Sequence, residues 1–250
     1  MPATPAWPPK SLPRLFVRTP LSAGASVVLD AAQANYLGNV MRLGIGAELL
    51  LFDGQSGEWL ARVSDAGRKS MSLTVERRTR EAESVPDIWL AFAPVKRAQT
   101  DWLVEKATEL GAARLLPVMT QRTIAERVKL ERLEAITIEA AEQCGRTRLP
   151  EIATPLGLKP LLELRDERRR VYFADEGGGE IAAQAFEPGP ALILIGPEGG
   201  FTDEERTLIR AAPNAVPISL GPRILRAETA ALAALAAYMA VAGDWRLIDP

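Results

Sequence analysis

The sequence predicts an α/β protein, with a mostly parallel sheet covered by helices on both faces and a small β-barrel in front of it. Three observations predict this fold class. Short β-like runs separated by turns crowd the first 80 residues, which is typical of a small barrel. Beyond them, apolar strand-like runs alternate with helical patterns, which indicates a parallel sheet. Two of these later runs end in a Gly-Pro step, at the strand ends where open α/β sheets bind ligands.

The composition is that of a globular protein of 250 residues with one or two domains. The net charge is −2, but residues 1–80 carry ten Lys and Arg against six Asp and Glu, so this part is the better candidate for phosphate contacts. One cysteine excludes an internal disulfide, and without histidine only carboxylates could complete a metal site, so we expect none. A general base must then be a carboxylate, a perturbed Lys, Cys or Tyr, a backbone group or water.

Neither the start nor the most apolar stretch of the chain indicates a membrane. Residues 1–13 contain five prolines and no apolar signal-peptide region, so we interpret them as a flexible tail. The run 227–242 contains Glu228 and is too short for a confident membrane span. We therefore expect a cytoplasmic protein with no membrane partner.

The barrel is expected over residues 14–80. Short β-like runs between turn signals predict strands over 15–17, 26–29, 48–52, 59–63 and 70–75, and we expect a short helix over 31–43. Arg14, Arg18 and Arg42 are candidate RNA contacts, with ordinary solvated arginines as the alternative. We interpret Arg77, Arg78 and Arg80 as part of a solvated linker.

A second domain is expected over residues 81–250, because the polar stretch 81–86 ends in proline. Strands are predicted over 88–93, 115–119, 171–174, 191–195 and 216–220, and helices over 99–110, 130–144, from 203 onward and 227–242. Cys144 falls on the apolar stripe of the second helix, so we expect a small buried hydrophobe, with a catalytic thiolate as the minor alternative.

The two Gly-Pro steps are the strongest candidates for a ligand site. The segment 196–200 reads Gly-Pro-Glu-Gly-Gly, and Thr202 and Glu205 follow as a capping box that starts a helix. The second step is Gly221-Pro222, which leads through Arg223 and Arg226 into the last helix. The P-loop pattern G-x-x-x-x-G-K-[ST] is absent, so a nucleotide triphosphate is not expected here.

The motifs IGPEGGFTDEE and SLGPRILRAETAALAALA resemble the C-terminal signature of SPOUT-type RNA methyltransferases. Within that superfamily the chain is most similar to the enzymes that methylate a uridine at N3 in small-subunit ribosomal RNA. The similarity extends upstream through residues 95–148, and the segments LFVRTPL and NYLGNVMRLGIGAELLLFDG resemble those of the family's PUA-like barrel.

This resemblance implies a trefoil-knotted domain that binds S-adenosylmethionine, a PUA-like RNA-binding barrel, a homodimer, and small-subunit ribosomal RNA as partner, in the assembled subunit. It implies that loops around 195–200 and 219–226, and one near 173–177, wrap the cofactor. The candidate cofactor residues are Ile195, Gly196, Pro197, Gly199, Gly200, Leu220, Gly221, Ile224, Leu225 and Thr229.

Methylation at uracil N3 requires loss of a proton and alignment of the acceptor with the donor. Arg226 is the candidate that stabilises charge on the ring, and Glu198 or Glu228 the candidate proton acceptor. Basic residues near strand and helix ends are further RNA candidates, namely Lys96, Arg146, Arg148 and Arg223.

Two other functions stay open. One is a different methyltransferase of the same superfamily, acting on the ribose 2′-oxygen or on another base. The other is a non-catalytic RNA-binding protein that has kept the barrel and lost affinity for the cofactor.

Overall fold

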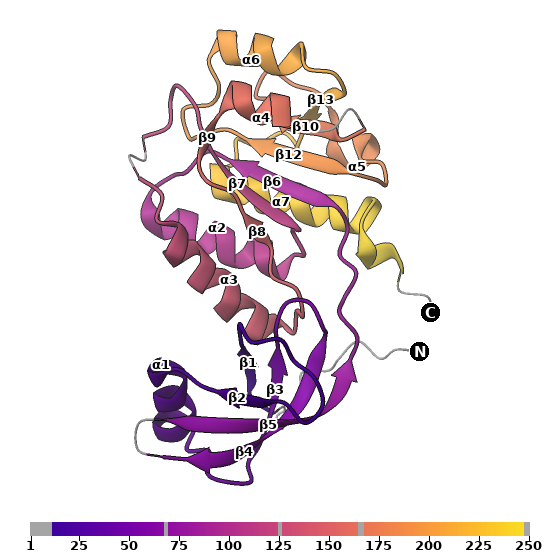
Figure 1. Ribbon diagram of the computed structural model, residues 1–250. Coiled ribbons are helices and arrows are strands. Elements are labelled where there is room, and N and C mark those ends of the chain that lie inside the picture. Colours follow the sequence, from indigo (N-terminus) through magenta and orange to yellow (C-terminus); the bar gives the residue numbers. More distant parts are fainter. Residues whose placement is uncertain (1–11, 68–69, 125–126, 165–167, 248–250) are drawn as a thin grey trace. The chain divides into compact units, whose positions relative to one another are not determined.

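The computed structural model describes residues 12–67, 70–124, 127–164 and 168–247 (Figure 1). All but the last two residues of the predicted tail therefore lie outside the described residues. The chain divides into two compact units. Residues 1–84 and 141–148 form the first, and residues 85–140 and 149–250 form the second.

The first unit is built on one five-stranded sheet around its own apolar core, and all five predicted strands are present. Its strands are β1 (Arg14–Phe16), β2 (Ser26–Val28), β3 (Glu48–Phe52), β4 (Glu58–Ala66) and β5 (Met71–Arg80). They are arranged in the order β1-β3-β4-β5-β2, and all neighbours are antiparallel except β1 and β3. Along the first half of β5, buried residues alternate with more exposed ones, with the period of two that is typical of a strand.

Two details of the first unit differ from the sequence prediction. The predicted helix is split into α1 (Ala31–Asn35) and a π-helical turn (Tyr36–Val40), after which Arg42 has a φ of 57°. Arg77, Arg78 and Arg80 do not form a linker, because β5 continues through them, paired with β4. The linker prediction was wrong because charged side chains on an exposed strand edge have the same composition as a solvated loop.

Arg14 is a structural residue and not an exposed RNA contact. Its Nε donates to Glu58 Oε2 at 2.8 Å, and its side chain is only 11% exposed. The two Nη groups donate to the carbonyls of Ala141, Glu142 and Arg146 at 2.6 to 3.0 Å. Arg14 therefore binds carbonyls in the last turn of a helix and just beyond its end, where backbone carbonyls lack the full set of helical partners.

We expect Arg14→Ala to lower the free energy of unfolding by about 2 kcal/mol, since buried carbonyls and the Glu58 carboxylate lose charged hydrogen bonds. Urea denaturation followed by circular dichroism measures this loss. Arg18→Ala, at an exposed position of the same unit, is the control and should change stability by less than about 0.5 kcal/mol. Equal stability of the two variants would contradict the structural role of Arg14.

The second unit contains an eight-stranded sheet in which all strand pairs are parallel. Its main path runs in the order β11-β13-β10-β12-β6-β7-β8, with β9 paired to β7. The strands are β6 (Ile88–Phe92), β7 (Arg114–Met119), β8 (Glu151–Ile152), β9 (Leu156–Gly157), β10 (Arg170–Ala174), β11 (Glu180–Ile181), β12 (Ala191–Ile195) and β13 (Ala215–Ser219). The five longer strands are those that the sequence predicted, within two residues at either end.

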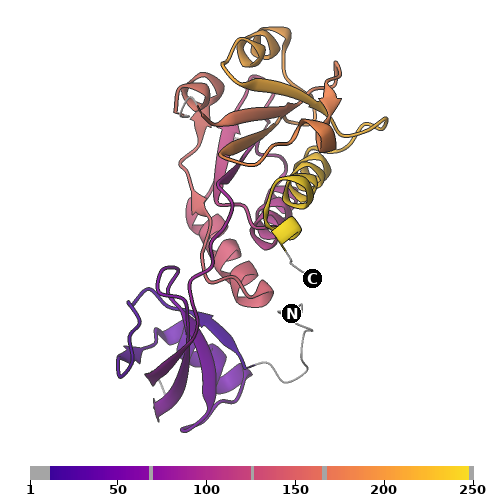
Figure 2. The same ribbon diagram turned by 90° about the vertical axis from the view of Figure 1, so that its right-hand side faces the viewer.

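Helices cover both faces of this sheet, as predicted (Figures 1 and 2). One core joins the sheet to α2 (Arg97–Glu109), α3 (Leu130–Cys144), α5 (Ala182–Ala185) and α7 (Ala227–Val241). The other core joins it to α4 (Leu158–Leu164) and α6 (Asp203–Arg210). Along β12, Ile193 and Ile195 enter the first core and Leu192 and Leu194 enter the second, so every side chain of this strand is buried. A strand covered on both faces explains the unbroken apolar run.

Cys144 is exposed, which corrects the expected buried position. The buried stripe of α3 runs through Leu133, Thr137, Ala140 and Ala141. Residues 141–148 belong to the first unit, so the end of α3 does not continue the stripe that its earlier turns bury in the second unit.

The sequence prediction missed the shortest elements, which are β8, β9, β11, α4 and α5, together with a 3-10 turn (Asp244–Leu247). Each is too short to show a hydrophobic period. The last long helix, α7, buries eight of its residues, including Glu228 and Tyr238. Of the described helices, none combines the length and the apolar character needed to cross a membrane.

Candidate functional site

Three adjacent strands of the second unit end at the same edge of the sheet. In the strand order, β10 lies between β13 and β12, and all three are parallel. The loops that follow Ala174, Ile195 and Ser219 therefore leave the sheet side by side. This edge is where open parallel sheets form ligand sites, and it brings together segments about 20 residues apart in the sequence.

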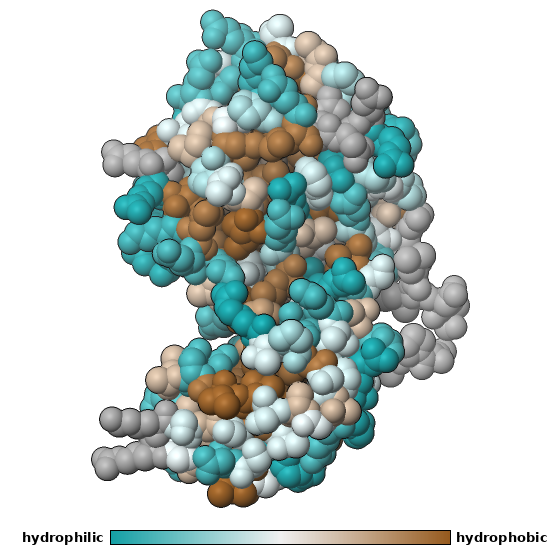
Figure 3. Space-filling model, viewed as in Figure 1, coloured by the Kyte–Doolittle hydropathy of each residue, from teal (hydrophilic) through white to brown (hydrophobic). Residues whose placement is uncertain are grey.

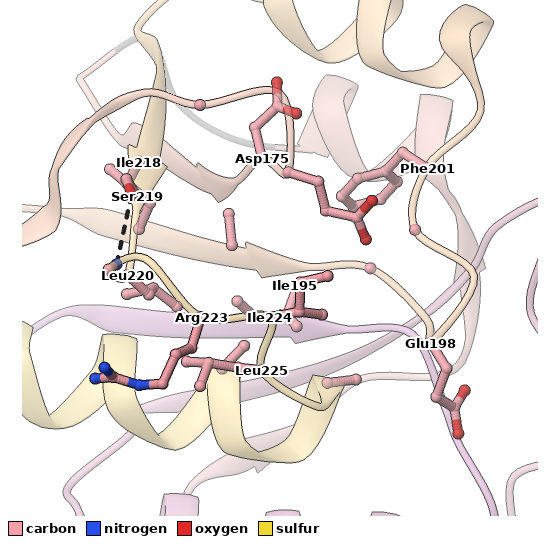
Figure 4. Close-up of a pocket in the computed structure, with 18 of the residues that line it drawn as sticks. Asp175, Ile195, Glu198, Phe201, Ile218, Ser219, Leu220, Arg223, Ile224 and Leu225 are labelled. Atoms are coloured by element: carbon pink, nitrogen blue, oxygen red, sulfur yellow. Dashed lines mark hydrogen bonds between the residues drawn. The ribbon is translucent and has the colours of Figure 1, made fainter.

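These three loops surround a cavity of about 490 Å³ (Figure 4). This volume lies within the range of cavities that hold small-molecule ligands. Its lining is mixed: Ile195, Ile218, Leu220 and Leu225 supply apolar surface, and Asp175 and other residues supply charge. We call this cavity the loop cavity.

Glycines keep the loop cavity open. Gly221 has a φ of 108° and Gly200 a φ of 66°, in the region that favours glycine over other residues. At Gly196, a Cβ atom would lie 3.1 Å from the ring of Phe201, so the backbone passes close to an aromatic side chain. The loops could not keep these paths with larger residues.

A capping box begins α6, as the sequence predicted, and it also holds a neighbouring loop. The Thr202 hydroxyl accepts from Glu205 N, and the Glu205 carboxylate accepts from Thr202 N at 3.0 Å. The other carboxylate oxygen of Glu205, which is 5% exposed, accepts from Gln121 N at 2.8 Å. Arg122 Nη1 donates to the carbonyl of Gly199 at 2.6 Å. The loop after β7 is thus attached to the loop after β12.

The structure gathers most of the predicted cofactor residues around the loop cavity. Those that line it are Ile195, Gly196, Pro197, Gly200, Leu220, Gly221, Ile224 and Leu225. Two predicted residues, Gly199 and Thr229, lie outside the lining. Thr229 is exposed in the first turn of α7, whereas Ala227 and Ala230 on that helix do line the cavity. Helical geometry explains this difference in position, since neighbouring residues of a helix point in different directions.

The three predicted catalytic residues are placed differently from one another. Glu198 lines the loop cavity and is exposed, with its side chain pointing away from Ile195 and Leu225 in Figure 4. Arg226 is exposed at the N-cap of α7 and lies outside the lining. Glu228 is 8% exposed and also lies outside it. Of the two predicted carboxylates, Glu198 is therefore the one that belongs to the lining of the cavity.

The two other carboxylates of the lining are paired with arginines. Asp175, whose side chain is 1% exposed, forms an ion pair with Arg210 and a longer one of 3.9 Å with Arg206. Glu176 lies 3.7 Å from Arg206. Among the described residues, Glu198 has no ion pair of this kind. The same residues contain no cluster of three or more His, Cys, Asp and Glu placed to hold a metal ion.

The predicted RNA contacts separate into buried and exposed residues. Arg14 and Arg146 are corrected, because both side chains are largely enclosed and hydrogen-bonded: Arg14 is 11% exposed, and Arg146 is 5% exposed with its Nε 3.3 Å from Glu83. A guanidinium enclosed in this way cannot also pair with a phosphate. The exposed candidates are Arg18, Arg42, Lys96, Arg148 and Arg223, of which Arg223 lines the loop cavity.

Sequence reasoning missed several residues of the lining, including Phe201, Arg206 and Ser219. Phe201 directly follows the glycines of the first loop, which was a usable signal. Arg206 gave no signal, since it lies on an amphipathic helix whose charged residues are typical of a solvated face.

Comparison with known proteins shows two family models that match this chain. Residues 81–239 match the family model described as an RNA methyltransferase domain, and residues 29–76 match the one described as an RNA methyltransferase PUA domain. The ribosomal RNA small subunit methyltransferase E of Synechocystis sp. is 35% identical over 231 residues, covering 89% of this chain and 76% of that protein. The protein of the same name from Rickettsia conorii is 30% identical over 229 residues, covering 89% of this chain and 93% of that protein.

A solved structure resembles nearly the whole chain. It is a ribosomal RNA small subunit methyltransferase E from Neisseria gonorrhoeae bound to S-adenosyl methionine, with a TM-score of 0.85 and 29% identity. The match covers 94% of this chain and 99% of that one.

Proposed function

The chain belongs to the RNA methyltransferase family with an N-terminal PUA domain, and from this we propose that it methylates N3 of a uridine in small-subunit ribosomal RNA. The methyl donor is S-adenosylmethionine. The observation that carries the proposal is the loop cavity, which has three glycine-bearing loops at adjacent strand ends and one unpaired carboxylate.

The loop cavity fits the cofactor in size and chemistry. A volume of about 490 Å³ suits a nucleoside with a short amino-acid chain. Apolar walls from Ile195, Leu220 and Leu225 suit an adenine ring, and the backbone near Gly196 and Gly221 offers amides and carbonyls for hydrogen bonds. When bound, the cofactor supplies a methyl group already activated by a positive sulfonium, so the protein's task is alignment.

The residues of this chain have two tasks beside alignment. The proton of uracil N3 must leave, and we assign its acceptance to Glu198, because it is the cavity-lining carboxylate without an arginine partner among the described residues. To Arg226, at the start of α7, we assign the stabilisation of negative charge on the uracil ring. A trefoil knot in this domain belongs to the same proposal.

The product nucleoside tests the proposal. The protein is incubated with S-adenosylmethionine labelled in its methyl group and with small ribosomal subunits from cells that lack the protein. The RNA is then digested and its nucleosides are identified by mass spectrometry. We expect 3-methyluridine, with more label in assembled subunits than in naked RNA. A 2′-O-methylated nucleoside or another methylated base would contradict the N3 assignment. Cofactor binding without methylation would favour the non-catalytic alternative.

We also propose a homodimer formed through α7. This helix is apolar on nearly every side, and Ala233 and Ala240 remain exposed although the sheet, α2 and α5 cover much of the helix. Light scattering at 10 µM should give twice the chain mass of 27.1 kDa. Ala233→Glu should shift the mass towards the monomer, whereas Ala183→Glu, at an exposed position of α5, should not. A fully active monomer would contradict the dimer.

A further inference from the structure

A second cavity of about 360 Å³ lies on the other side of Glu198. It is lined by the segment before α2, the first turns of α2, Ile124 and residues 127–129, and the start of α3. Glu198 lines both this cavity and the loop cavity. A ligand group held here would therefore lie next to whatever occupies the loop cavity.

The charge of this second cavity is strongly positive. Two carboxylates, Asp101 and Glu198, face a larger set of cations, which are Lys96, Arg97, Arg127, Lys129 and Arg132. Arg132 holds Asp101 through both oxygens at 2.6 to 3.0 Å, and this bond raises the pKa of Arg132. Within the described part of the chain, Lys96, Arg127 and Lys129 form no ion pair, so their charges remain available.

The start of α2 adds to this positive field. The helix has 13 residues, its N-cap Lys96 makes no side-chain capping bond, and its first turn contains no acidic residue. The first amides of such a helix point towards an anion, and the helix dipole favours negative charge there. The buried Thr100 hydroxyl bonds both the amide and the carbonyl of Val95 at 3.1 Å, which holds the turn in place.

The floor of this second cavity is apolar. Val95 and Leu133 are buried there, at 5% and 3% exposure, and Val128 and Ile124 lie beside them. Figure 3 shows apolar surface flanked by hydrophilic side chains on this part of the second unit. Cations around an apolar floor suit a ligand with an anionic group and a flat apolar group, which is the chemistry of a nucleotide.

The wall between the two cavities is fixed by hydrogen bonds. Arg122 holds the carbonyl of Gly199 at 2.6 Å, and Gln121 N donates to the buried Glu205 at 2.8 Å. Gly199 follows Glu198 directly, so the first of these contacts holds the backbone next to Glu198.

We infer that the second cavity binds a phosphodiester group and the adjoining base of the acceptor RNA strand, beside the nucleotide that reacts at Glu198. This assignment rests on the proposed function. RNA is favoured over an acidic peptide because the cavity shares Glu198 with the methyl-donor site of an RNA methyltransferase.

The salt dependence of RNA binding tests the assignment. The probe is a fluorescein-labelled dodecamer of uridylate, and its anisotropy is followed between 50 and 300 mM KCl. Each lost phosphate contact lowers the slope of log affinity against log salt by about 0.7 for a single strand. Lys96→Ala and Lys129→Ala should each lower the slope by about 0.7, and the double variant by about 1.4. Lys159→Ala, an exposed lysine of α4 outside the cavity, is the control and should leave it unchanged.

Two further measurements separate this inference from the proposed function. Calorimetry should give the same S-adenosylmethionine affinity for the double variant and the wild type. An unchanged salt slope in the double variant would overturn the cavity assignment. The proposed function would then still be supported, provided that the wild type binds the cofactor and methylates the RNA. Competition with the labelled RNA separates RNA from an acidic peptide. If a dodecamer of glutamate displaces the labelled RNA at the same concentration as unlabelled uridylate, the assignment to RNA is overturned.

Discussion

Replacing Glu198 with glutamine is expected to slow single-turnover methylation by about 10³-fold, because a neutral amide cannot take the proton of uracil N3. Both substrates must be saturating, so that weaker binding is not mistaken for slower chemistry. Cofactor affinity measured by calorimetry should stay within about twofold of the wild type, since glutamine keeps the shape of the side chain and only removes its charge.

Two matched variants sharpen this experiment. Glu204→Gln, an exposed carboxylate of α6 outside the loop cavity, should react at the wild-type rate. Glu228→Gln tests the alternative proton acceptor. A normal rate for Glu198→Gln together with a slow rate for Glu228→Gln would move the role to Glu228 and contradict our assignment.

Arg226→Ala belongs to the same series, and we expect a rate loss on the order of 10²-fold if the guanidinium stabilises charge on the ring. If Arg226→Ala only raises the RNA concentration needed, Arg226 binds RNA and does not act on the transition state.

Gly221→Val is expected to weaken S-adenosylmethionine binding by about 100-fold or more. The structure attributes this loss to the backbone: no atom lies within 4 Å of the added Cβ, but a φ of 108° is one that valine rarely adopts. The loop must change its path, and its amides and carbonyls then leave the cavity wall. Isothermal titration calorimetry measures the affinity, and circular dichroism confirms that the variant is folded.

Gly24→Val is the control for backbone strain. Gly24 has a φ of 81° and no atom within 4 Å of an added Cβ, and it lies in the first unit and does not line the loop cavity. It should lose stability while keeping full cofactor affinity. Unchanged affinity in a folded Gly221→Val protein would show that the cofactor does not bind at this loop.

The length and burial pattern of the longer elements followed from the sequence alone. Five apolar residues in a row at 191–195 predicted a strand buried on both faces, and β12 is buried at every position. Thr202 and Glu205 predicted the start of α6 to the residue, because a capping box depends only on local hydrogen bonds. The paired Gly-Pro steps likewise located the loops of the cavity, since glycine permits backbone paths that other residues do not.

The tertiary structure decided which of these residues meet. No sequence pattern shows that β10 lies between β13 and β12, yet this order places Asp175 in the cavity wall, where Arg206 and Arg210 hold it. The same limit explains Arg14, which looked like a surface cation until the fold supplied Glu58 and three carbonyls more than 120 residues away. Charge and periodicity are local properties of a chain, whereas partners for a buried charge come from whichever segments the topology brings next to it.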